Sequence, residues 1–61
     1  MWKIVSSTDG QHIGEVVVPP STKGDLIFND GDKVFINTIK TVDNDTIQLV
    51  SVNCVFTAVK V

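Results

Sequence analysis

Apolar residues along this chain fall in short runs separated by clusters of turn formers, and no window shows the 3.6-residue period of an amphipathic helix. The centre shows this best. Lys33–Val42 and Thr46–Ser51 are filled with β-branched and aromatic residues, and between them lies Asp43-Asn44-Asp45. The pattern predicts a central β-hairpin to which the other strands are added.

The register of this central hairpin stays open. Pairing Ile39 with Val50 and Val42 with Ile47 matches apolar residues across the two strands. A shift by one residue pairs Ile39 with Leu49 and matches them equally well.

A second hairpin is predicted at the start of the chain, where Trp2–Thr8 and Gln11–Val18 flank Asp9-Gly10. Further along, Pro19 and Pro20 end its second strand because proline cannot donate to a strand ladder.

This first hairpin has two possible registers. A three-residue loop places Lys3 opposite Glu15 and Val5 opposite Ile13, whereas a two-residue loop places Ile4 opposite Glu15. We favour the three-residue loop because opposite charges and apolar side chains then match across the strands.

The remaining segments are a loop, a turn and a final strand. An exposed loop is expected over Ser21–Gly24, a tight turn over Asn29–Asp32, and a final strand over Cys54–Val61.

Composition supports the same fold class. Valine, isoleucine and threonine together make up 23 of the 61 residues, and their branching at Cβ favours pleated strands. The length leaves room for one small core. The sequence therefore predicts a single all-β domain over residues 1–61, a five- or six-stranded antiparallel barrel or sandwich.

The segment from residue 25 to residue 36 resembles the diverging turn of SH3 domains. The matching positions are an apolar pair, a Gly-Asp turn and the alternating apolar residues that follow: Leu26, Phe28, Gly31, Asp32, Val34 and Ile36. The resemblance implies an SH3-like barrel with Leu26 and Phe28 in the core. The chain has no tyrosine and a single tryptophan, Trp2, so the aromatic groove for proline-rich peptides does not carry over.

Charge and cysteine content limit the partners. The net charge is −2, arginine is absent and the five lysines are dispersed, so nucleic acid is not the expected partner. The single cysteine, Cys54, excludes a disulfide within the chain, and one cysteine with one histidine cannot fill a four-ligand zinc site. No cofactor is expected. No apolar run is long enough for a membrane-spanning helix and no signal peptide is recognised, so we expect a cytoplasmic protein.

Two turns each contain a pair of aspartates, Asp30 with Asp32 and Asp43 with Asp45, which resemble the carboxylate pairs of metal or acid–base sites. A calcium-binding loop of the EF-hand type needs a glutamate at its twelfth position. Counted from Asp43 this position holds Cys54, and counted from Asp30 it holds Thr41. We interpret both pairs as turn residues that bond their own backbone.

A catalytic thiol would need His12 beside Cys54. We expect instead an exposed, ordinary histidine near a hairpin tip and an inert buried thiol, and therefore no enzyme.

Apolar residues occupy both faces of several strands, whereas an antiparallel strand with one face in solvent should alternate apolar and polar residues. In the last strand, Cys54, Phe56 and Ala58 are expected to pack inside with Phe28 and Ile36. The residues expected outside form a self-association surface: Val55, Val59 and Val61.

These features predict a non-enzymatic protein-interaction module or small accessory subunit that forms a homo-oligomer. A chain of this size is typical of accessory subunits and of virus- or mobile-element-encoded modulators. The alternative is a nucleic-acid-binding small barrel of the SH3-like or OB type, which would stack bases on aromatic side chains.

Overall fold

Six antiparallel strands and no helix make up the computed structural model, which describes all residues from 1 to 61. The strands are β1 (Trp2–Ser7), β2 (Val16–Val17), β3 (Gly24–Ile27), β4 (Lys33–Asp43), β5 (Thr46–Ser51) and β6 (Val55–Lys60). The all-β prediction is confirmed. None of the chain forms a helix that could cross a membrane.

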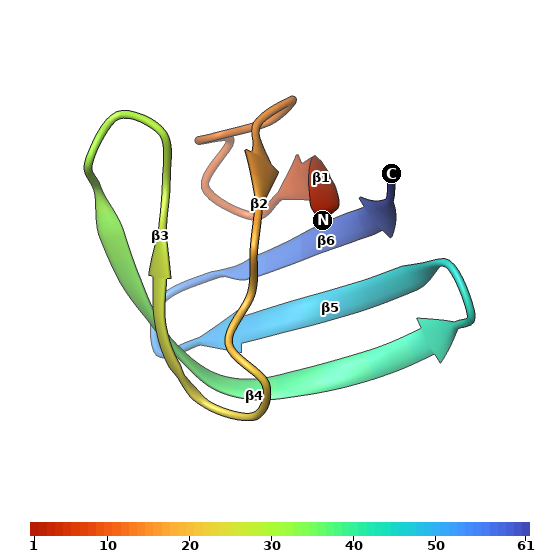
Figure 1. The fold of residues 1–61 in the computed structure, drawn as a ribbon. Helices are drawn as coiled ribbons and strands as arrows, with labels where there is room; N and C mark the ends of the chain where they lie inside the picture. Colours follow the sequence, from red (N-terminus) through yellow and green to blue (C-terminus); the bar gives the residue numbers. More distant parts are fainter.

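The strands follow one another across a single sheet in the order β2-β1-β6-β5-β4-β3. The sheet curls until its two edge strands, β2 and β3, approach each other, which gives a nearly closed barrel (Figure 1). No strand pairing joins β2 to β3. We call this unpaired boundary the seam.

Ten buried apolar residues fill the barrel, and they come from every strand and from two of the connections. They are Ile4, Val17, Leu26, Phe28, Ile36, Ile47, Leu49, Cys54, Phe56 and Ala58. In β5 and β6 every second residue is buried, as the two-residue strand period requires. The predicted inward face of the last strand, with its partners Phe28 and Ile36, is confirmed.

The central hairpin is confirmed, and its register is the one that pairs Ile39 with Leu49. The ladder shifts at two places, between Ile36 and Thr38 and between Thr41 and Asp43. Such bulges increase the local twist of a strand, and β4 is the long strand that curves around the barrel.

The first hairpin differs from the prediction. Only Val16 and Val17 form β2, and Lys3 pairs with Val16, so the predicted pairing of Lys3 with Glu15 is wrong. Instead the backbone N–H of Ile4 donates to the carbonyl of Glu15 over 2.9 Å, which places Ile4 opposite Glu15 as in the alternative register.

The reason is long-range. The Glu15 carboxylate accepts a hydrogen bond from the backbone N–H of Asn29, on the other side of the seam, and does not pair with a lysine on the neighbouring strand. The chain before it turns at His12 and Gly14, which both have positive φ angles of 65° and 93°. Residues of a regular β-strand have negative φ angles, so this segment cannot be the strand of a regular hairpin.

The turn between β3 and β4 has the features that the resemblance implied. Leu26 and Phe28 are buried, and the N–H of Phe28 donates to the carbonyl of Asp32 over 2.8 Å. Gly31 lies in the left-handed region with φ of 91°, which favours glycine. The two core positions are therefore confirmed.

Candidate functional site: a histidine clasp across the barrel seam

His12 lies against the barrel core rather than at an exposed tip. Its side chain is only 9% exposed, and its ring stacks on the ring of Phe28 with centroids 3.7 Å apart and 4° between the planes. The expectation of an exposed, ordinary histidine is wrong. The segment before β2 brings this ring onto Phe28, and the stacked contact joins it to the barrel core.

Glu15 links this histidine to the opposite edge of the sheet. Its Oε2 lies 2.7 Å from Nδ1 of His12, and its Oε1 accepts a hydrogen bond of 3.0 Å from the backbone N–H of Asn29. Asn29 belongs to the turn between β3 and β4. One carboxylate thus bridges the seam at a point where the strands themselves do not pair.

Two aspartates of the same turn face the imidazole. Oδ2 of Asp30 lies 3.8 Å from Nδ1 of His12, and Oδ2 of Asp32 lies 3.4 Å from Nε2. The other oxygen of Asp30 accepts from the backbone N–H of Asp32 over 3.0 Å. The prediction that this acidic pair serves its own turn is confirmed, but the pair also faces a histidine. We call His12, Glu15, Asp30 and Asp32 the histidine clasp.

The second acidic pair has only the predicted role. Oδ1 of Asp43 accepts from the backbone N–H of Asp45 over 2.8 Å at the tip of the central hairpin. This turn has the same backbone chemistry as the turn of Asp30, but no histidine lies beside it.

The clasp favours a positive charge on the imidazole. The pKa of His12 is raised above its usual value of 6.5, chiefly by the hydrogen bond to Glu15. Burial opposes this shift, and the negative charges of Glu15, Asp30 and Asp32 add to it. The three carboxylates therefore stabilise a positive charge at this place.

Cys54 lies apart from this chemistry. The thiol is buried, and its Sγ lies 3.5 Å from the hydroxyl of Ser51. The nitrogens of His12 face carboxylates instead. The structure therefore does not bring together the Cys–His pair that a thiol nucleophile would require, and the prediction of a buried thiol is confirmed.

The predicted self-association residues lie on the outer side of β6, but they are unequally exposed. Val61 is 63% exposed, whereas Val55 and Val59 are half-buried. Because β6 is paired with β1 on one side and β5 on the other, this surface is a sheet face and not a strand edge.

A more exposed apolar surface lies at the β3 end of the sheet. Ile27, Phe35 and Val52 are 61%, 49% and 82% exposed. Phe35 and Val52 line one shallow groove, and Ile27 lies on the edge strand next to β4. We call these three residues the apolar patch. The sequence signal was the run Val34-Phe35-Ile36, with apolar residues on both faces of one strand.

Comparisons of the chain with protein-family models, with curated proteins and with solved structures find no significant match. The fold and the clasp therefore define a class only: a small six-stranded antiparallel barrel whose seam is bridged by side chains.

Proposed function

We propose that the protein is a non-enzymatic interaction module that binds a second copy of itself through the apolar patch. The observation that carries this proposal is the position of the patch. Its three side chains are strongly exposed, and they gather at the β3 end of the sheet, outside the barrel. Neighbouring exposed apolar side chains of this kind commonly mark a protein–protein contact.

A second copy fits this surface for a geometric reason. A twofold axis brings the apolar patches of two copies face to face, so that each copy covers the exposed side chains of the other. Ile27 of each copy then approaches the patch of the other. The rim contains one residue of each charge, Asp25 and Lys33, which suits a contact with an identical surface.

We also assign the barrel to the SH3-like class in this proposal. The support is the tight turn from Phe28 to Asp32, with a left-handed Gly31 and a buried Leu26. The peptide groove of signalling SH3 domains is not part of the assignment, because its aromatic residues are missing from the sequence.

The test is the mass in solution, measured by light scattering across a concentration series. We expect about twice the chain mass of 6.6 kDa at high micromolar concentration. Phe35→Asp should restore the monomer, whereas Val42→Asp should not, because Val42 is equally apolar and 58% exposed but lies at the far end of β4. A monomer at every concentration would overturn the proposal.

One further variant separates the two candidate surfaces. If Val61→Asp dissociates the dimer and Phe35→Asp does not, the contact is the outer face of β6 and not the apolar patch. Val61 is exposed, so that the charge does not enter the core.

The alternative function, nucleic-acid binding, is favoured by one observation. Phe35 is a half-exposed aromatic ring, and Lys33 lines the same groove. A ring beside a cation can stack a base and contact a phosphate. The net charge of −2 opposes this reading, and we expect no retardation of single-stranded DNA or RNA at moderate salt.

A further inference from the structure

We propose that His12, Asp30 and Asp32 form a binding site for a divalent transition-metal ion of the Zn²⁺ class. The three residues each offer one donor atom, and these atoms all lie within 4.8 Å of one another. Imidazole nitrogen and carboxylate oxygen are both ligands that Zn²⁺ uses in proteins.

The orientation of the imidazole is the first argument. A carboxylate only accepts hydrogen bonds, so in the neutral ring the 2.7 Å contact with Glu15 places the proton on Nδ1. The lone pair is then on Nε2, which faces Oδ2 of Asp32 over 3.4 Å. In the charged ring Nε2 carries a proton that faces Asp32, and a metal ion at this place would take the position of that proton.

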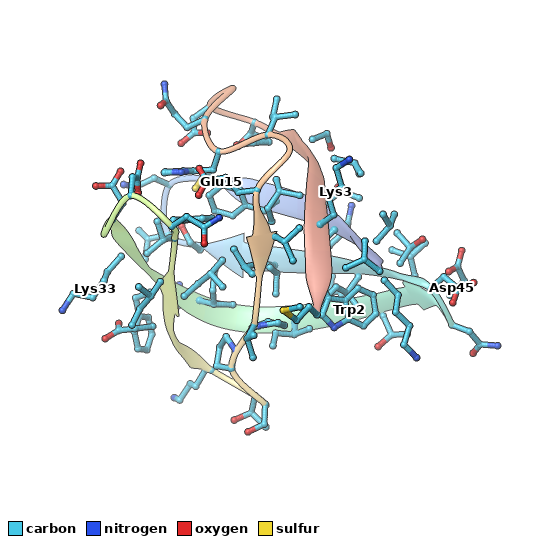
Figure 2. The ribbon with its side chains drawn as sticks, turned by 45° about the horizontal axis from the view of Figure 1, so that its top comes forward. Trp2, Lys3, Glu15, Lys33 and Asp45 are labelled. Carbon is cyan, nitrogen blue, oxygen red and sulfur yellow. The ribbon has the colours of Figure 1, made fainter.

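A second carboxylate behind a metal-binding histidine is the arrangement found in metal centres generally. There the far ring nitrogen donates to a carboxylate, which fixes the tautomer and makes the near nitrogen a better ligand. Glu15 has this position, and it is itself held by the backbone N–H of Asn29. Figure 2 shows Glu15 directed from the segment before β2 toward the turn that precedes β4.

Two of the three ligands are restrained before any ion binds. The ring of His12 is nine-tenths buried and lies flat on Phe28, so it has little freedom to rotate. One oxygen of Asp30 is fixed by its turn hydrogen bond, which leaves the other facing the ring. Fixed ligands reduce the entropy that metal binding must overcome.

The distances suit a small ion. Bonds of about 2.1 Å in a tetrahedral centre place neighbouring ligands about 3.4 Å apart. Nε2 of His12 and Oδ2 of Asp32 already have this separation. Asp30 and Asp32 are 55% and 66% exposed, so that their side chains can adjust and water can fill the remaining position.

The ligand set also selects against hard cations. Ca²⁺ takes six to eight oxygen ligands and Mg²⁺ requires near-octahedral oxygen geometry, and neither prefers an imidazole. We therefore expect saturable binding of Zn²⁺ and Co²⁺ by the clasp and none of Ca²⁺ or Mg²⁺ at comparable concentrations.

The experiment is calorimetric titration of Zn²⁺ into chelator-treated protein, with Co²⁺ absorption as a second reading. Asp32→Asn and Asp30→Asn should each weaken binding about tenfold or more, because each removes a charged ligand. An amide oxygen at position 30 still accepts the turn hydrogen bond, so that the fold is retained. The matched control is Asp43→Asn, which makes the same change in a turn without a histidine.

His12→Asn tests the nitrogen ligand, since asparagine tolerates the positive φ of this position. Ring nitrogen shifts in nuclear magnetic resonance give an independent reading in the unaltered protein, where Zn²⁺ should move Nε2 more than Nδ1. A stoichiometry of one per chain that is lost in these variants supports the proposal. The proposal is overturned if no binding is detected, if binding is unchanged in Asp32→Asn, or if Co²⁺ shows a thiolate band from Cys54.

Discussion

The ring of His12 lies flat on the ring of Phe28, with 3.7 Å between their centroids. His12 precedes β2 and Phe28 follows β3, so this contact joins the two edge strands that share no strand pairing. Phe28 in turn packs against Phe56 of β6, with centroids 5.4 Å apart. The histidine clasp therefore connects the seam to the centre of the core.

The first prediction concerns pH, in buffer that contains a chelator. The pKa of His12 is raised on folding, so the folded state holds this proton more tightly than the unfolded state. The resulting stabilisation is fully present below about pH 6.5 and is lost as the pH rises through the higher folded pKa. Urea unfolding should therefore give a lower free energy of unfolding at pH 8.5 than at pH 6.

The comparison variant for this prediction is His12→Asn. Every other titratable group is present in both proteins, so the difference between the two pH profiles isolates His12. Parallel profiles would show that the imidazole does not gain a proton-dependent stabilisation on folding.

The second prediction contrasts two phenylalanines. Phe56 is fully buried, and Phe56→Ala should cost about 3–5 kcal/mol, which is enough to unfold a domain of this size. Phe35 is 49% exposed in the apolar patch, and Phe35→Ala in the monomer should change stability by about 0.5 kcal/mol or less. Thermal unfolding followed by circular dichroism at low protein concentration would compare them. Similar losses for both would contradict the burial described here.

Part of this fold follows from the sequence and part does not. The central hairpin was predictable because Asp43 organises its own turn through a local hydrogen bond and β-branched residues flank it. The first hairpin was not, because Glu15 bonds to Asn29, which lies 14 residues away. Local pairing rules matched Glu15 with Lys3 and could not predict the distant partner, Asn29.

The site was hidden for the same reason. The acidic turn and the histidine were each visible in the sequence, and each had an ordinary local explanation. Only the closure of the barrel brings Asp32 within 3.4 Å of His12, and no pattern within the chain specifies how a sheet closes. The three-residue spacing between His12 and Glu15 was the one local signal of a linked pair.

The third prediction separates backbone strain from crowding at Gly31. A Cβ added there meets no atom within 4 Å, but φ is 91°. Gly31→Ala should therefore destabilise by about 1–2 kcal/mol through backbone strain alone. D-alanine at the same position, introduced by chemical synthesis, should not destabilise and is the control. Equal losses with both forms would mean that the space around Gly31 is filled.

The last prediction concerns Glu15, which acts on the metal site through His12. Glu15→Gln keeps the size of the side chain but replaces the charged acceptor of the Nδ1 proton by a neutral amide. The ring is then oriented less strongly and its Nε2 is a weaker ligand, so Zn²⁺ affinity should fall by about tenfold or more. The same change removes the largest cause of the raised pKa of His12, so that this pKa should move back toward 6.5. Both quantities are measurable on one sample, by calorimetry and by the pH dependence of the His12 ring resonances. A purely structural role for Glu15 would lower the unfolding temperature without moving either, and that result would remove Glu15 from the site.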